Sequence, residues 1–424
     1  MEGDMAYPRM MHIQQHFQTP KVDDISQTVR DEVAKLDLAQ KVRPGNTVAI
    51  TAGSRGVANI ALITKTLVEA LHALGAKPFI VPAMGSHGGG VAEEQRKIIE
   101  HYGITEDYVG APIKASMDVV QVTATEDGIP VFFDKHAFEA DHVVVVNRVK
   151  PHTDFVGAIE SGLHKMMLIG LGKHRGASVY HKAILHYSFD RIIRSVGQSV
   201  IKSCHILFGL AIIENQKHET ALIEAIPPAD FVEREQTLLV SAKEWMSRLP
   251  FDTVDLLIVD EMGKEISGGG MDANVVGRKF NYNRAVEDEY PKVTRIYVRS
   301  LTEATHGNVA GLAIADFAHA QVIREMNPEV SYTNAVTASS PAAVSVPIHY
   351  DTDRKVLDVA LQTIGYIEPE QAKMIWIRNT LALEHLLVSE AYVEEIQRRD
   401  DLTIRGPAQD LQFTTHGDLH PFPL

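Results

Sequence analysis

The sequence predicts an α/β fold of two domains with mostly parallel sheets and an active-site cleft between them. Short apolar runs alternate with amphipathic segments, glycines such as Gly75 and Gly103 stand at helix ends, and 424 residues are too many for one ordinary core. We expect an N-terminal α/β domain over residues 1–250 and a C-terminal α/β domain over residues 251–424 that closes the cleft. Clefts of this kind are favoured ligand sites.

The first half of the chain alternates expected strands and helices. We predict strands over 46–53, 77–85, 140–149 and 205–213, and helices over 56–76 and 91–103. The strand over 140–149 (ADHVVVVNRV) is apolar almost throughout, which is typical of a strand buried on both faces. The segment 214–250 is interpreted as a linker with a helical part.

The second half repeats the pattern. Strands are expected over 251–263, 292–302 and 373–380, and helices over 317–326 and 391–400.

Composition limits the classes of partner. The formal net charge of -14, with no block of Lys and Arg, argues against nucleic acid. No apolar run reaches the length of a membrane span, and the N-terminal residues lack the pattern of a secretory signal. The single cysteine, Cys204, fits a reducing compartment and is expected to be an inert core thiol. We therefore expect a cytoplasmic protein without a membrane partner.

Polar loops follow three of the expected strands: TAGSRG (51–56), MGSHGGG (84–90) and NRVKPHTDF (147–155). Because ligands gather at the carboxyl ends of parallel strands, neighbouring strands would bring these loops to one rim. The side chains expected there are Arg55, His87, Arg148, Lys150 and His152. As alternatives, GSHGGG is only a turn, and Arg55 caps a helix or forms a surface ion pair. No G-x-G-x-x-G fingerprint or P-loop is present.

The segment ESGLHKMM (160–167) places Lys165 among apolar residues. A partly buried lysine can become nucleophilic or carry a covalent cofactor, whereas a lysine that reaches to solvent from a helix end is the ordinary alternative. His174 and His181 are seven residues apart and share one face if the segment is helical. Either could equally be a structural histidine. No HExxH, CxxC or EF-hand pattern occurs.

With GSHGGG, KPHTDF, ESGLHKMM and His181 in view, the chain resembles the lactate racemase (LarA-like) family of nickel-pincer-nucleotide isomerases over about residues 8–400. The resemblance implies that Lys165 carries the pyridinium-derived cofactor covalently, that His181 is the nickel ligand, and that His87 and His152 are the catalytic histidines. Ala52 stands where lactate racemase has an acidic residue, and GKEISGGGMDANVVGR (263–278) differs from its substrate loop, so a divergent branch is implied.

The implied activity is racemisation or epimerisation of a 2-hydroxy acid by reversible hydride transfer through a 2-keto acid. The α-hydrogen beside an ionised carboxylate is too weakly acidic for simple proton abstraction, and two bases are needed because the hydroxyl points differently in the two epimers. Arg55 is expected to contact the cofactor and to clamp the substrate carboxylate, with Lys264 and Arg278 as second candidates for the clamp.

The polar loop residues Asp272 and Asn274 suit the extra hydroxyls of a sugar acid such as an aldonate, although the loop could be only a structural turn. The implied partners are the small-molecule substrate and the proteins that make and load the cofactor, and a homo-oligomer is compatible. Protein from a host without those proteins is expected to lack the cofactor. The alternatives are a Schiff-base lysine enzyme of the pyridoxal phosphate type and a non-enzymatic two-domain protein that binds carboxylates.

Overall fold

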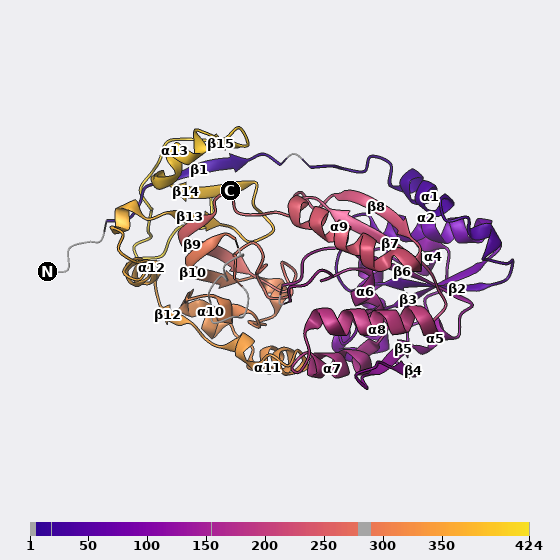
Figure 1. The fold of residues 1–424 in the computed structure, drawn as a ribbon. Helices are drawn as coiled ribbons and strands as arrows, with labels where there is room; N and C mark the ends of the chain where they lie inside the picture. Colours follow the sequence, from indigo (N-terminus) through magenta and orange to yellow (C-terminus); the bar gives the residue numbers. More distant parts are fainter. Residues whose placement is uncertain (1–5, 18, 154, 279–289, 424) are drawn as a thin grey trace. The chain divides into compact units, whose positions relative to one another are not determined.

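The computed structural model describes residues 6–17, 19–153, 155–278 and 290–423, which form two compact units. We call Thr19–Met246 the N-terminal unit, and Ser247–Leu424 together with Met1–Gln18 the C-terminal unit (Figure 1). The division lies near the predicted boundary at 250. The first residues differ from the prediction, because β1 (Met10–Gln15) pairs with β14 (His385–Ser389) and β15 (Leu402–Ile404) of the C-terminal unit.

The N-terminal unit is built on a five-stranded sheet in the order β3-β2-β6-β7-β8. All neighbours are parallel except β7 and β8. Its strands are β2 (Thr47–Ala52), β3 (Lys77–Pro82), β6 (His142–Arg148), β7 (Ile206–Glu214) and β8 (Thr220–Ile226). The predicted strands over 46–53, 77–85, 140–149 and 205–213 are thus confirmed, and the valines of β6 are buried as their apolar run indicated.

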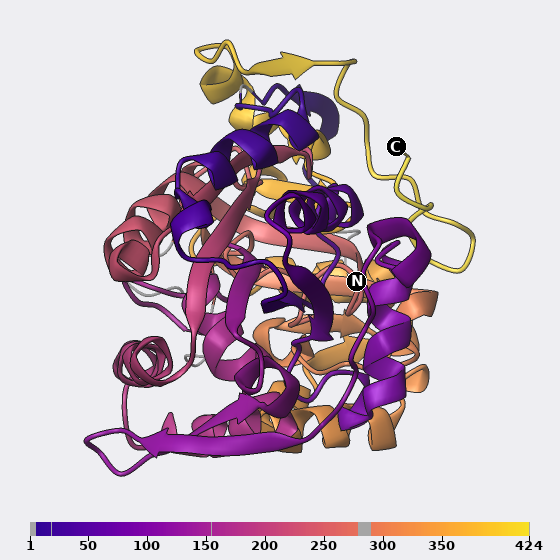
Figure 2. The ribbon, with the colours of Figure 1, turned by 90° about the vertical axis from the view of Figure 1, so that its right-hand side faces the viewer.

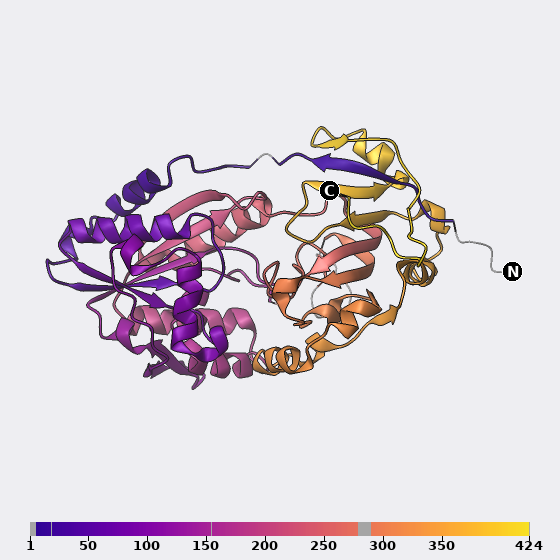
Figure 3. The same cartoon turned by 180° about the vertical axis from the view of Figure 1, so that it is seen from behind.

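Helices cover both faces of this sheet. One face packs against α1 (Ile25–Ala34), α2 (Ile60–Ala73) and α3 (Ala92–His101), and the other against α5 (Lys135–Phe138), α6 (Leu163–Lys165), α7 (Lys173–Ala183), α8 (Phe189–Ser203) and α9 (Phe231–Trp245). In Figure 1 α1 and α2 lie above the sheet and α8 lies below it, and Figure 3 shows the same layers from behind. A helix of one turn, α4 (Glu106–Val109), completes the set.

A separate two-stranded sheet joins β4 (Val119–Ala124) to β5 (Pro130–Asp134), seen as a long hairpin at the bottom of Figure 2. The predicted linker over 214–250 is wrong: it contains β8 and α9, both packed into the N-terminal unit. Cys204 is buried, which raises the pKa of its thiol to about 12, as expected for an inert core thiol.

The C-terminal unit is built on an eight-stranded sheet in the order β12-β11-β10-β9-β13-β14-β1-β15. The pairs β12/β11, β11/β10, β10/β9 and β9/β13 are parallel, and the pairs β13/β14, β14/β1 and β1/β15 are antiparallel. The remaining strands are β9 (Thr253–Met262), β10 (Lys292–Leu301), β11 (Phe317–His319), β12 (Ile348–Tyr350) and β13 (Met374–Ile377). Its helices are α10 (Ala320–Arg324), α11 (Pro328–Thr337), α12 (Asp353–Leu361) and α13 (Val393–Ile396).

Two helix predictions for this unit need correction. The helix expected over 317–326 begins only at Ala320, because Phe317–His319 pairs with β10 and β12 as β11. The helix expected over 391–400 is limited to Val393–Ile396. Within the described ranges, no helix has both the length and the apolarity needed to cross a bilayer.

Candidate active site

The strand order of the N-terminal unit brings three polar loops to one edge of its sheet. β3, β2 and β6 are adjacent and parallel, so their carboxyl ends point the same way. They are followed by the loops of His87, Arg55 and His152 respectively. Neighbouring strands are about 4.8 Å apart, so the two histidine loops leave strands roughly 10 Å apart with the Arg55 loop between them. The sequence predicted that these loops meet at one rim if their strands are neighbours, and the sheet order shows that the strands are neighbours.

His87 is held by the loop beside it. Its Nδ1 makes a hydrogen bond with the Ser54 hydroxyl, which comes from the loop after β2. The buried Gln95 amide donates to the carbonyls of Gly85 at 3.0 Å and His87 at 2.9 Å. The loop is therefore more than a flexible turn, and His87 itself stays exposed to solvent.

Arg55 is exposed at the same edge, yet surrounding protein atoms desolvate it and so lower the pKa of its guanidinium. Tyr102 opposes this shift, and Arg148 at the end of β6 adds to it. Arg148 forms an ion pair with Glu214. Because an arginine stays protonated even so, the result is a cation in partly desolvated surroundings, which is well suited to a carboxylate.

His152 lies beyond the end of β6 and is half-buried. Its backbone N–H donates to Glu160 at 2.7 Å. Its ring packs against Phe155 and Phe189, with centroids 4.8 and 5.6 Å away. A carboxylate therefore fixes the backbone and two aromatic rings fix the imidazole plane.

Lys165 and His181 lie within electrostatic reach of one another, sixteen residues apart in sequence. Lys165 ends α6, a π-helical turn follows over Met166–Gly170, and His181 lies near the end of α7. Both residues are half-buried. Burial lowers the pKa of His181, and the positive charge of Lys165 lowers it further. π-helical turns often occur at functional sites.

The loops of Arg55 and His87 pack onto the turn that follows Lys165. A methyl group added to Gly53 would lie 3.3 Å from Met166 Cε. At Gly85, where φ is +63°, it would lie only 2.9 Å from Ile169 Cγ2, so glycine is required there on both counts. The structure thus joins the two loops to the segment of Lys165 in one region of the N-terminal unit.

The predicted substrate residues of the C-terminal unit are engaged in its own structure. Arg278 is 1% exposed and donates to the carbonyls of Val293, Thr294 and Ile314 and, at 2.7 Å, to Asp316. These contacts use all five guanidinium N–H groups, which argues against the predicted role of Arg278 as a substrate clamp.

Lys264, Asp272 and Asn274 also make contacts that hold loops. Lys264 Nζ donates to the carbonyls of Gly268 at 2.7 Å and Ala310 at 2.6 Å. Asp272 Oδ1 accepts the backbone N–H of Asn274 at 2.9 Å and its side-chain amide at 3.0 Å. This is the geometry of the structural turn that the sequence left as an alternative.

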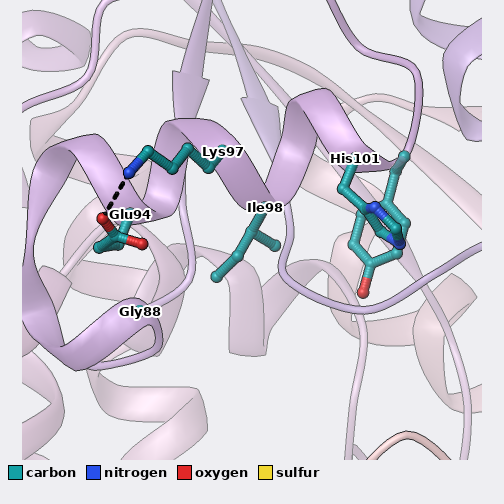
Figure 4. Close-up of a pocket in the computed structure, with 6 residues that line it drawn as sticks. Gly88, Glu94, Lys97, Ile98 and His101 are labelled. Atoms are coloured by element: carbon teal, nitrogen blue, oxygen red, sulfur yellow. Dashed lines mark hydrogen bonds and ion pairs between the residues drawn. The ribbon is translucent and has the colours of Figure 1, made fainter. Parts of the chain in front are cut away.

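An open pocket of about 440 Å³ lies along α3 and is lined by Gly88, Glu94, Lys97, Ile98, His101 and Tyr102. Figure 4 shows the Lys97–Glu94 ion pair at one end of it and His101 at the other. It adjoins the His87 loop through Gly88, but Lys165 and His181 are not among its lining residues.

Sequence reasoning missed several side chains that shape this region: Ser54, Glu160, Glu235 and Lys243. Glu160 holds His152, and Glu235 accepts a hydrogen bond from His164 Nδ1 at 2.6 Å. Nothing in the local pattern marks Glu235, because its partner is 71 residues away. In the part of the chain that the structure describes, no three His, Cys, Asp or Glu side chains cluster as a metal cage.

Comparison with known proteins finds a family match over the N-terminal part of the chain and two solved structures of similar fold. Residues 9–191 match the family model of the lactate racemase N-terminal domain, a range that contains Arg55, His87, His152, Lys165 and His181. The lactate racemase apoprotein from Thermoanaerobacterium thermosaccharolyticum has a similar fold, with a TM-score of 0.50 and 12% identity over 88% of this chain and 99% of that one.

A protein from Thermotoga maritima, solved by structural genomics, gives a TM-score of 0.53 and 12% identity over 84% of this chain and 97% of that one. No protein with curated function matches the sequence. Fold and sequence match together define a two-domain α/β protein with a lactate racemase N-terminal domain. The chain therefore carries a lactate racemase N-terminal domain over residues 9–191, the part that contains its loop motifs.

Proposed function

We propose that the protein is a nickel-pincer-nucleotide-dependent racemase or epimerase of a 2-hydroxy acid, possible substrates including sugar acids such as aldonates. The observation that carries the proposal is that Lys165 lies near enough to His181 for its charge to lower the pKa of that imidazole, while the loops of Arg55 and His87 pack onto the turn after Lys165. Lys165 would hold the cofactor covalently, and His181 would complete the coordination of its nickel ion.

The residues present fit such a group. The lowered pKa of His181 favours the neutral imidazole, which is the form that binds a metal. The described residues offer no cage of three protein ligands, so a metal held through His181 would need other donors, and a pincer nucleotide brings them. When bound, this cofactor supplies a hydride acceptor, which side chains alone do not provide.

The chain's own residues supply the proton transfers and the orientation. His87, whose Nδ1 makes a hydrogen bond with the Ser54 hydroxyl, would act as the base that takes the substrate hydroxyl proton. His152, on the loop after β6, would serve the epimer whose hydroxyl points the other way. Arg55 leaves β2, between the strands that lead to the two histidines, and would clamp the carboxylate there.

The test is turnover by protein produced together with the cofactor-making proteins. The loaded protein is incubated with a panel of 2-hydroxy acids and aldonates in deuterium oxide, and epimers are followed by NMR. We expect one substrate class to epimerise with retention of its α-hydrogen. His87→Asn and His152→Asn should each abolish this, while His72→Asn on α2 serves as the matched control. Rapid exchange of the α-hydrogen with solvent, or no turnover by loaded protein, would contradict the proposal.

A Schiff-base enzyme would use the same half-buried amine of Lys165. Borohydride treatment in the presence of pyridoxal phosphate or a keto acid separates the two functions. A reduced adduct on Lys165 would favour the Schiff-base enzyme, whereas a nucleotide adduct present before any treatment favours the racemase. A carboxylate-binding protein without enzymatic activity would bind members of the panel and convert none.

A further inference from the structure

Helix α9 belongs to the region of the candidate site. Phe231, Leu238, Leu239 and Ala242 place it in the core on the face of the sheet that also packs α6 and α8. Two of its charged side chains, Glu235 and Lys243, make contacts with the segment 150–165. This is the segment that contains both His152 and Lys165.

Glu235 contacts the residue next to Lys165. Its carboxylate accepts His164 Nδ1–H at 2.6 Å and the backbone N–H of His164 at 3.1 Å. Both side chains are buried, with exposures of 0% for His164 and 1% for Glu235. The carboxylate also lies where a side chain on Gly162 would be, since a methyl group there would come within 2.1 Å of Glu235 Oε1. Glu235 therefore fixes the start of α6 from two directions.

This pair is poorly explained by stability alone. Among the described residues, His164 Nε2 is buried without a hydrogen-bond partner. A buried nitrogen without a partner costs free energy, which an apolar side chain of similar size would avoid. Such local conflicts between sequence and stability are expected at functional sites.

Lys243 acts at the other end of the segment. Its amine lies 2.6 Å from Glu160 Oε1, and the Glu160 side chain is fully buried. Glu160 Oε2 accepts the backbone N–H of His152 at 2.7 Å. The ion pair with Lys243 compensates the buried carboxylate that holds His152.

We propose that α9 is the positioning helix of the site: Glu235 fixes the segment of Lys165, and Lys243, through Glu160, fixes the segment of His152. The functional meaning of these two targets rests on the proposed function, but the positioning itself does not. Neither Glu235 nor Lys243 is a catalytic residue in this scheme, because each acts through another group.

The test uses the full chain without cofactor. Glu235→Gln and Lys243→Met are compared with Arg234→Met, a matched control that breaks a 2.7 Å ion pair between the same helix and Glu224. Acylation of Lys165 and carbethoxylation of His152 are measured by peptide mass spectrometry, with far-UV circular dichroism and thermal unfolding alongside.

We expect Glu235→Gln to change the Lys165 rate on the order of 10-fold while the His152 rate stays within about 2-fold, because a hydrogen bond to a charged group is lost at one end only. Lys243→Met should give the reverse pattern, and Arg234→Met neither. If Glu235→Gln does not fold, Glu235→Asp, which keeps the charge, should give a smaller change at Lys165 alone. Equal changes at both residues, or none, would overturn the proposal.

Loaded protein separates this inference from the proposed function. Selective labelling changes combined with a lower kcat and an unchanged KM in Glu235→Gln would support both. Selective labelling changes in a protein that epimerises no substrate would support the positioning role and count against the racemase.

Discussion

Replacing Lys173 by methionine should destabilise the N-terminal unit strongly. Lys173 Nζ lies 2.9 Å from Asp134 Oδ2, and both side chains are fully buried. The same amine donates to the carbonyl of Pro82, at the end of the strand that leads to the His87 loop. Lys173 also begins α7, which carries His181. The substitution would leave the Asp134 charge buried without its cation.

The expected cost is about 3–5 kcal/mol, which is typical when one partner of a buried ion pair is removed. A unit of the length of Thr19–Met246 loses roughly 2–4 °C of Tm per kcal/mol, so the variant should melt about 6–20 °C lower. Arg191→Met is the matched control because it breaks an ion pair with Asp127 in which the arginine is 59% exposed. A surface pair of that kind should cost about 1 kcal/mol or less.

Tryptophan fluorescence can report on this unit alone. The chain has two tryptophans, Trp245 in the N-terminal unit and Trp376 in the C-terminal unit. In a Trp376→Phe background, urea unfolding followed through Trp245 gives the free energy of the N-terminal unit without assuming that the whole chain unfolds in one step.

A loss below about 1 kcal/mol in Lys173→Met would refute the reasoning, because a buried pair cannot be that weakly coupled. The double variant Lys173→Met/Asp134→Leu should recover part of the loss by removing the uncompensated charge. Recovery should stop about 1 kcal/mol short, since Asp134 also caps α5 by accepting the Ala137 N–H at 2.8 Å. A double variant no more stable than the single one would show that the buried charge is not the cause.

Three further outcomes are expected. In NMR titrations of cofactor-free protein, the pKa of His181 should lie below the ordinary histidine value, and Lys165→Met should move it part of the way back, since burial is the larger cause. As the pH drops below about 6.5, the His181 imidazole is protonated in the unfolded chain before it is protonated in the folded protein. The contribution of His181 to stability should therefore fall over that range. Arg55→Lys should raise KM roughly 10- to 100-fold with a smaller effect on kcat, because lysine cannot grip a carboxylate through two N–H groups. Arg278→Met should destabilise the C-terminal unit by about 3–5 kcal/mol, measured by urea unfolding followed through Trp376, and leave KM unchanged, which a substrate clamp would not.

The sequence was most informative where local pattern and tertiary role coincide. The buried valines of β6 gave a continuous apolar run, and the glycine-rich loop of His87 followed a clear strand, so both could be placed without coordinates. The resemblance to the lactate racemase family linked Lys165 with His181, and the structure brings the two within electrostatic reach of each other.

Contacts between residues far apart in the sequence could not be predicted from the sequence alone. β1 pairs with strands more than 370 residues away, and nothing in its sequence, MMHIQQ, indicates which strands those are. The guanidinium of Arg278 could bind a carboxylate, but its five hydrogen bonds go to groups at least 15 residues away in the sequence and hold the C-terminal unit together. Glu235 was overlooked for the same reason: its carboxylate looks like any charge on a helix until His164 is seen beside it.

The most direct test of the central claim is the mass and metal content of protein produced together with the cofactor-making proteins. Peptide mapping should find a single nucleotide adduct on Lys165, with stoichiometric nickel by elemental analysis. Lys165→Arg should lose both, and His181→Ala should keep the adduct and lose most of the nickel. An adduct on another lysine, or nickel that persists in Lys165→Arg, would contradict the account.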